Sequence, residues 1–295
     1  MKAATAKTRT RFESILFATD FSPAAAHAIP FIKKLAGHFQ SNLVALHVRP
    51  PVVNPMTQPG TWPVDVEAAK VFDKEHREEL LDTFAGIDTE VRIEEGDIQP
   101  RLENAIQKYN TDLVIIGTRG RTGLAKILLG SVAEEIFRTV ACPVLTVGPH
   151  SDAGKANIRE ILFATDFASE VPAAAAYAVS LAQEFQARLT LLHVVPEPKP
   201  GDLVSWFDVR ESSKQLLRNL VPPEAEAWCK PEYFVERGEA AERILDLANL
   251  RAVDLIVLGA QPEKGVPGAA THLPIATAHK VIAHANCPVL TVRSK

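Results

Sequence analysis

Glycines and cations gather between two hydrophobic segments in the first half of the chain. Residues 113–116 form a short apolar run rich in β-branched side chains, typical of a buried parallel strand. Ser131 and Glu134 have the spacing of a capping box, so we expect a helix to begin there. Between them lie Gly117, Arg119, Gly120, Arg121, Lys126 and Gly130. Because glycine allows close approach and a helix N-terminus presents free N–H groups, this segment predicts a phosphate-binding loop.

The spacing of these residues resembles a known family pattern. Gly117-x2-Gly120-x9-Gly130-Ser131 is similar to the nucleotide loop of the universal stress proteins, small α/β domains of which one branch binds ATP. The pattern is neither a Walker A loop, which needs GKS or GKT, nor a GxGxxG fingerprint. On the loop alone, an ordinary glycine-rich turn between a strand and a helix remains the alternative.

Composition and charge narrow the classes of function. The 295 residues are 46% hydrophobic and 23% charged, which is typical of a soluble globular protein with room for two domains. The formal net charge of −4 argues against a general nucleic-acid or anionic-membrane surface. No apolar run approaches the roughly 20 residues that span a bilayer, and the basic first residues lack the apolar core of a secretory signal. We therefore expect a cytoplasmic location and neither nucleic acid nor membrane as a partner.

The cysteines add no sign of metal or disulfide chemistry. Cys142, Cys229 and Cys287 form neither a CxxC pair nor a Cys/His ligand cluster. Such usage favours a reducing compartment in which the thiols pack in the core.

An internal repeat organises the whole chain. Residues 15–21 recur unchanged at 161–167, an offset of 146, and the segment Cys142–Val147 recurs unchanged as Cys287–Val292. Two copies at a period near half the chain indicate a duplicated domain and not a short-repeat solenoid.

We predict domain boundaries from this repeat. The first domain covers residues 12–148 and has the intact loop, and the second covers 158–293. Residues 149–157 are small, polar and turn-forming, as in a linker.

Each copy alternates strands and helices. The first copy predicts strands at 14–19, 43–48, 90–94, 113–116 and 144–147, and helices at 22–39, 65–84, 97–109 and from Ser131. This alternation predicts an α/β fold with a mostly parallel sheet and helices on both faces. The resemblance to universal stress proteins covers nearly the whole chain, twice, and implies two doubly wound five-stranded domains with strand order 3-2-1-4-5.

Residues at the strand ends complete the expected crevice. In a doubly wound sheet, ligands bind at the carboxyl ends of the strands where the strand order reverses. Thr19 and Asp20 end the first strand, and Gly117 ends the fourth. The resemblance implies that Asp20 belongs to an ATP site, where a carboxylate holds a ribose hydroxyl or a magnesium ion on the phosphates. The alternative is that Asp20 supports the start of the next helix together with Ser22.

The other candidate residues also have two alternative roles each. The resemblance implies that main-chain groups at Val48 read adenine, whereas Val48 alone is a core residue. His47 is more typical of a packed or hydrogen-bonded histidine than of an acid–base group. Arg119 pairs with phosphates or is a solvated loop charge. Ser131 caps its helix, contacts a phosphate, or does both.

The second copy departs from the pattern where the loop should be. After Gly259 the spacing of glycines is lost, and prolines without N–H groups and one carboxylate enter the segment. Asp166 and Val194 persist at the matching strand ends. We predict that the second half binds ATP poorly or not at all.

These observations lead to an ATP-binding regulatory protein of the stress response whose first half holds the nucleotide. The alternatives are a nucleotide-independent interaction scaffold and a slow ATP hydrolase. No catalytic triad, carboxylate pair or metal-ligand spacing stands out, so we assign no catalytic residue. The protein partner remains unidentified. The last strand of each copy lies at a sheet edge by the family's order, which predicts either a homodimer or an intrachain pseudo-dimer.

Overall fold

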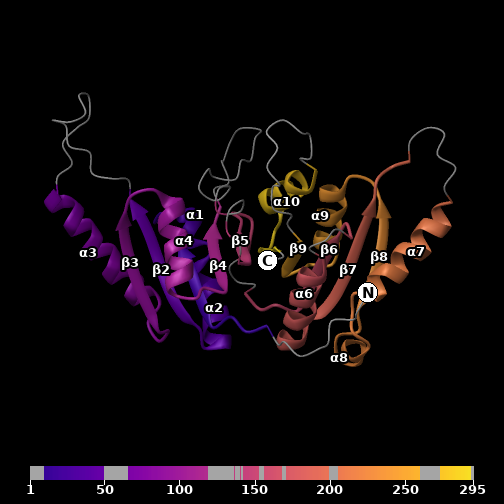
Figure 1. The fold of residues 1–295 in the computed structure, drawn as a ribbon, viewed down its shortest axis with the longest axis horizontal. Helices are drawn as coiled ribbons and strands as arrows, with labels where there is room; N and C mark the ends of the chain where they lie inside the picture. Colours follow the sequence, from indigo (N-terminus) through magenta and orange to yellow (C-terminus); the bar gives the residue numbers. More distant parts are fainter. Residues whose placement is uncertain are drawn as a thin grey trace.

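The computed structural model describes residues 10–49, 66–118, 136, 140, 142–152, 156–167, 171–198, 205–259 and 273–293. Strands and helices alternate along the chain in two copies of one pattern (Figure 1). The strands are β1 (Ser14–Ala18), β2 (Asn42–Arg49), β3 (Thr89–Glu95), β4 (Leu113–Gly117), β5 (Val144–Val147), β6 (Glu160–Thr165), β7 (Arg188–Val195), β8 (Glu232–Arg237), β9 (Leu255–Gly259) and β10 (Val289–Val292). The helices are α1 (Pro23–Ala26), α2 (Ile29–Phe39), α3 (Val66–Thr83), α4 (Ile98–Lys108), α6 (Val171–Phe185), α7 (Trp206–Arg218), α8 (Glu226–Cys229), α9 (Ala240–Leu250) and α10 (Leu273–His284).

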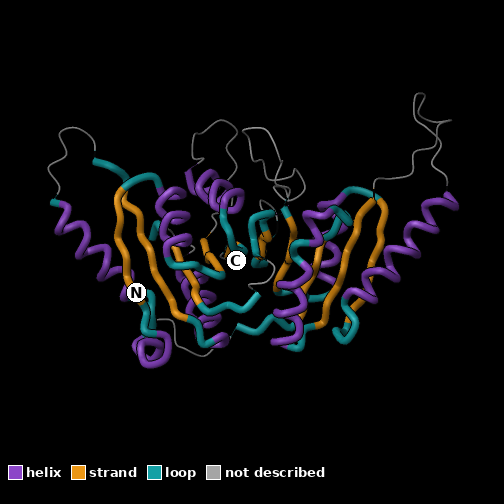
Figure 2. The backbone as a smooth tube through the Cα atoms, turned by 180° about the vertical axis from the view of Figure 1, so that it is seen from behind, coloured by secondary structure: helices purple, strands orange, loops and turns teal. Residues whose placement is uncertain are grey.

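All the described strands join one sheet, which crosses the molecule from end to end (Figure 2). Its order is β3-β2-β1-β4-β5-β10-β9-β6-β7-β8, so each half has the expected order 3-2-1-4-5 with parallel neighbours. The two five-stranded halves join at the middle, where β5 pairs antiparallel with β10; pairing of these two edges within one chain is one of the two arrangements that the sequence left open. The physical reason is that each of these strands leaves an open edge, and their pairing satisfies the N–H and C=O groups of both.

Helices cover both faces of the sheet. The sheet separates the hydrophobic core into two layers, one on each face. Side chains alternate along β1, so Ile15 and Phe17 enter one layer and Leu16 enters the other. The first layer contains buried residues of α2 and α6, and the second contains buried residues of α4, α9 and α10. Both layers continue through both halves.

The predicted elements are found with one difference in the described part of the chain. The helix expected over residues 22–39 is interrupted: α1 ends at Ala26 and α2 begins at Ile29. Pro30 lies in the first turn of α2, where its missing N–H costs no helical hydrogen bond, so the helix restarts there. Ser22 caps α1 as predicted, because its hydroxyl accepts the Ala25 N–H at 3.2 Å. The helix expected from Ser131 lies outside the described residues.

A repeated aspartate ties strand starts together at the edge opposite the crevice. The Asp112 carboxylate accepts the N–H of Glu13 at 2.7 Å, and Asp254 accepts the N–H of Arg159 at 2.8 Å. Burial raises the pKa of Asp112, while the backbone N–H groups of Glu13 and Ser14 oppose that rise. The amino end of β1 is thereby held next to β4 in the first half, and β6 next to β9 in the second.

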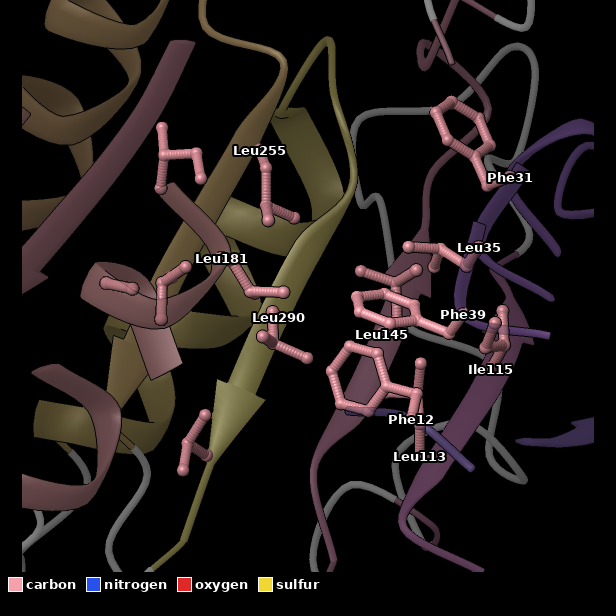
Figure 3. Close-up of a cluster of buried hydrophobic side chains, with 14 of the residues drawn as sticks. Phe12, Phe31, Leu35, Phe39, Leu113, Ile115, Leu145, Leu181, Leu255 and Leu290 are labelled. Atoms are coloured by element: carbon pink, nitrogen blue, oxygen red, sulfur yellow. The ribbon is translucent and has the colours of Figure 1, made fainter. Parts of the chain in front are cut away.

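The joint between the halves brings matching residues face to face. Leu145 lies opposite Leu290 in the β5–β10 ladder, and both are buried. The rings of Phe39 and Phe185 are 5.8 Å apart, and His38 Nε2 lies 3.0 Å from Glu184 Oε1 across a separation of 146 residues. Figure 3 shows Phe12, Leu35 and Phe39 beside Leu145, with Leu290 and Leu181 across the joint. Since each residue meets its own counterpart, the interface is isologous, as in a symmetric dimer.

Truncating the centre of this joint tests its contribution to stability. Leu290 is 1% exposed, so Leu290→Ala should lower the free energy of unfolding by about 2–5 kcal/mol through lost burial and a residual cavity. Leu250→Ala is the matched control because Leu250 is 82% exposed, and we expect it to change stability by less than about 0.5 kcal/mol. Urea denaturation followed by circular dichroism measures both. Equal effects of the two substitutions would contradict a stabilising joint.

The pH dependence of stability tests the Asp112 clamp. Asp112→Asn keeps an oxygen acceptor for the Glu13 N–H and removes the charge. Because the folded-state pKa of Asp112 lies above its ordinary value of 3.8, the folded protein holds this proton more tightly than the unfolded chain. The contribution of Asp112 is therefore greatest below that value and declines as pH rises through the folded pKa. Urea unfolding between about pH 3 and 7 should show the parent losing stability relative to Asp112→Asn; a gain would refute it.

Candidate functional site

The strand order places a crevice between β1 and β4. After β1 the chain builds outward through β2 and β3, and then it returns to β4 on the other side of β1. Such a reversal is where open α/β sheets bind ligands, outside the carboxyl ends of the strands. Thr19 and Asp20 directly follow β1, Val48 lies near the end of β2, and Gly117 ends β4. The structure thus brings these four predicted residues to one edge of the sheet.

A tight turn carries Thr19 and Asp20 from β1 into α1. The Thr19 N–H donates to the Leu46 carbonyl at 3.0 Å, and the buried Thr19 hydroxyl accepts the Phe21 N–H at 3.1 Å. Phe21 has a left-handed backbone with φ of 58°, a conformation that costs a residue with a Cβ roughly 1–2 kcal/mol. Such strain persists only where the surroundings hold it in place.

The Asp20 carboxylate is exposed and takes part in the same turn. Its Oδ1 accepts the Ser22 N–H at 2.9 Å, and the Ser22 hydroxyl in turn caps α1. Asp20 therefore supports the start of the helix, which is the alternative role that the sequence left open. A carboxylate has about four acceptor positions on its two oxygens, so one side chain can support a helix start and also accept from a ligand.

Aromatic rings and two histidines cluster around the turn that follows β1. His47 Nδ1 lies 2.8 Å from the Thr19 carbonyl, and its ring is 4.7 Å from that of Phe21. Because a carbonyl only accepts, Nδ1 carries the proton. This agrees with the predicted hydrogen-bonded role. Sequence reasoning missed Phe72 and His76 of α3, whose rings stack at 3.8 Å beside Phe21. Their i, i+4 spacing on a helix was the available signal.

Gly117 allows α1 to pass directly over the end of β4. A Cβ on Gly117 would lie 2.2 Å from the Ala24 carbonyl oxygen and 2.6 Å from Ala25 Cα. These are backbone atoms, so no side-chain rotation relieves the clash. Glycine is therefore required here by packing alone. Val48 is half-buried, and its side chain packs against the second core layer.

The second half repeats the turn with nearly the same geometry. The Phe167 N–H donates to the Thr165 hydroxyl at 3.0 Å, and φ of Phe167 is 62°. His193 Nδ1 lies 2.8 Å from the Thr165 carbonyl, and the Phe167 and His193 rings are 4.4 Å apart. The turn is thus a property of the fold that does not depend on the glycine loop.

The remaining predicted loop residues, Arg119, Gly120, Arg121, Lys126, Gly130 and Ser131, lie outside the described residues. Among the residues with a described position, no group of three or more His, Cys, Asp or Glu side chains is arranged to hold a metal ion. The role of Asp20 toward a phosphate-bound magnesium ion therefore stays a prediction.

The cysteines are free thiols with little access to solvent. Cys229 and Cys287 are buried and Cys142 is half-buried. Burial raises the pKa of Cys287 to about 12, so this thiol is protonated at neutral pH and is a poor nucleophile. In the described ranges, no helix is both long and apolar enough to cross a bilayer.

Comparisons with known proteins match this architecture. A universal stress protein of Mycolicibacterium smegmatis is 22% identical over 302 residues, which cover 95% of this chain and 97% of that protein. Universal stress protein YxiE of Bacillus subtilis is 32% identical over 132 residues, covering 39% of this chain and 86% of its own length. The crystal structure of a universal stress protein from Archaeoglobus fulgidus has a TM-score of 0.71 at 21% identity and covers 96% of this chain and 99% of its own. That likeness shows the shared fold.

One solved universal stress protein is in complex with cAMP. It is similar to 47% of this chain at 21% identity, with a TM-score of 0.33, and the nucleotide is a property of that protein.

The family model provides the decisive match. The model of the universal stress protein family matches residues 11–148 and again residues 157–293, one match in each half. The chain therefore belongs to the universal stress protein family, with two family regions in tandem.

Proposed function

We propose that the first half binds ATP in the crevice between β1 and β4 and that the protein is a nucleotide-dependent regulator of the stress response. The observation that carries the proposal is the meeting of Thr19, Asp20, Val48 and Gly117 at the reversal of strand order, directly before a loop with the family's glycine spacing. Ligands of doubly wound folds bind at this position.

The residues around the crevice fit the parts of a nucleotide. Asp20 has acceptor capacity for a ribose hydroxyl or a phosphate-bound magnesium ion, and main-chain groups near Val48 are polar partners for adenine. The amides from Gly117 to Ser131 are donors for the phosphates, and Arg119 adds a positive charge. The bound phosphates would supply the negative charge that orders this loop around them.

The second half lacks the features that the first half offers. Pro262 and Pro267 remove N–H donors from its loop, and Pro274 removes one from the first turn of α10. Glu263 adds a negative charge that repels any phosphate. We therefore propose about one nucleotide per chain, held by the first half. The second half then acts as a structural or partner-binding copy.

A regulatory role follows from the location of the loop. Nucleotide binding would shift the equilibrium of conformations of residues 117–131, and a protein partner, still unidentified, would read that surface. We propose a cytoplasmic protein with at most slow ATP hydrolysis. Because β5 and β10 already pair within the chain, we propose an intrachain pseudo-dimer in which these edges are not available to a second chain.

Matched substitutions in the two loops test the assigned site. Gly120→Glu places a carboxylate and a Cβ among the phosphate donors, so it should weaken ATP binding at least about 100-fold, or about 2.7 kcal/mol. Gly268→Glu makes the same change in the degenerate loop of the second half and should leave the affinity unchanged. Isothermal titration calorimetry with Mg-ATP measures affinity and stoichiometry for both variants and the parent.

The melting temperature distinguishes the scaffold alternative. A nucleotide that binds only the folded state must raise the melting temperature in proportion to RT ln(1 + [L]/Kd). We expect Mg-ATP to stabilise the parent and Gly268→Glu but not Gly120→Glu. If Mg-ATP stabilises none of them, the nucleotide-independent scaffold is the better account. If two nucleotides bind per chain with similar affinity, the assignment to the first half is wrong.

A further inference from the structure

An arginine at the outer end of the second half is stacked but has no acceptor. Arg237 ends β8, and its guanidinium carbon lies 4.1 Å from the ring centroid of Trp206, the first residue of α7. Its Nε is buried and has no hydrogen-bond partner within the described part of the chain. A buried N–H without an acceptor is unfavourable by roughly 1–3 kcal/mol, so it requires a physical explanation.

The first half shows a different arrangement at the corresponding place. In the β2–β3 register Arg49 lies opposite Glu95, and in the β7–β8 register Val195 lies opposite Arg237. Arg49 and Glu95 form an ion pair at 3.1 Å, which Asp73 of α3 joins at 3.7 Å. The second half has therefore lost both members of an internal ion pair and gained a cation at the carboxylate position.

Charged side chains near the outer end of the second half form ion pairs with residues other than Arg237. Arg251 makes two hydrogen bonds to the Glu232 carboxylate, at 2.8 and 2.6 Å. Glu239 pairs with Lys280 at 3.5 Å, and Glu236, one residue before Arg237, points to the opposite face of the strand. Among the residues that the structure describes, no carboxylate lies within ion-pair distance of Arg237.

Stacking prepares the guanidinium for an oxyanion. An indole beneath the guanidinium face holds the group in one orientation. Because Nε is buried, the donors that remain for a ligand are those of the two terminal nitrogens. Those donors match the spacing of two oxygens of a carboxylate or phosphate. Trp206 also begins a helix of 13 residues, whose N-terminus favours negative charge nearby. The Ser205 side chain accepts the Asp208 N–H, so it satisfies one of the first free N–H groups.

We propose that Arg237 and Trp206 form an oxyanion-binding site in the second half, for a small ligand with a phosphate or carboxylate group. The site lies where β8 meets α7, at the end of the sheet opposite α3 (Figure 1). It is separate from the crevice between β1 and β4 and does not depend on nucleotide binding there. The tandem protein would then sense two ligands, one in each half.

Calorimetric titration of the full-length protein with inorganic phosphate, and separately with succinate, tests this site. We expect saturable binding of at least one of these anions to the parent. Arg237→Gln should weaken it more than about tenfold, the loss of one charge-assisted interaction. Arg237→Lys keeps the charge without the planar fork and should also weaken binding. Arg210→Gln is the matched control, because Arg210 is an exposed cation of α7, and we expect less than a twofold change.

The outcomes separate the site from its alternatives. Binding of one anion but not the other identifies the ligand as a phosphate or a carboxylate compound. Absence of saturable binding of both anions to the parent overturns the proposal, and so does an equal loss in Arg237→Gln and Arg210→Gln, which would indicate general charge attraction. If Arg237→Gln fails to fold, the same titrations are made with Arg237→Lys and Trp206→Leu, and both should bind the anion more weakly than the parent. Arg237→Gln should bind Mg-ATP as the parent does, so failure of the ATP site and failure of this site are distinguishable.

Discussion

The antiparallel contact between β5 and β10 determines how the two halves of the molecule are arranged relative to each other. It closes the open inner edge of each half, and the two-fold relation across it places Leu145 against Leu290. The contact reverses the strand direction, but seven strand pairings separate β2 from β7. At roughly 20–25° of twist per pairing, the sheet turns by roughly 140–175° over that distance, which nearly cancels the reversal. Accordingly, the arrowheads of β2 and β7 lie on the same side in Figure 1.

Because the two halves share one fold, comparing their equivalent contacts distinguishes residues that the fold requires from residues that it does not. The hydrogen bond between His47 and the Thr19 carbonyl recurs between His193 and Thr165 at the same 2.8 Å, although the second loop is degenerate. A contact kept in both halves is explained by the fold. Features that differ between the halves, such as Arg237 in place of Glu95, are not explained by the shared fold.

Sequence patterns predicted the fold well because the elements are strongly periodic. The strand 144–147 was predicted at its observed bounds, and the repeat offsets placed the matching strands of the second half. The break between α1 and α2 was missed, because helical periodicity continues through residues 22–39 and outweighed Pro30. The stack of Trp206 on Arg237 could not be predicted either, since the two residues are far apart in sequence and meet only because α7 packs against β8. For the site, the strand-end residues were predictable from topology, whereas their hydrogen bonds were not.

The glycines of the loop pattern do not carry equal evidence for a nucleotide. Gly117 is required because a Cβ would meet the backbone of α1 at 2.2 Å, so its presence reports helix packing whether or not a ligand binds. The second half agrees with this reading, because it keeps Gly259 at the end of β9 while losing the spacing that follows. Gly120 and Gly130 have no counterpart at that spacing in the degenerate loop, so no shared packing requirement explains them. The evidence for a phosphate-binding loop therefore lies in the second and third glycines of the pattern and not in the first.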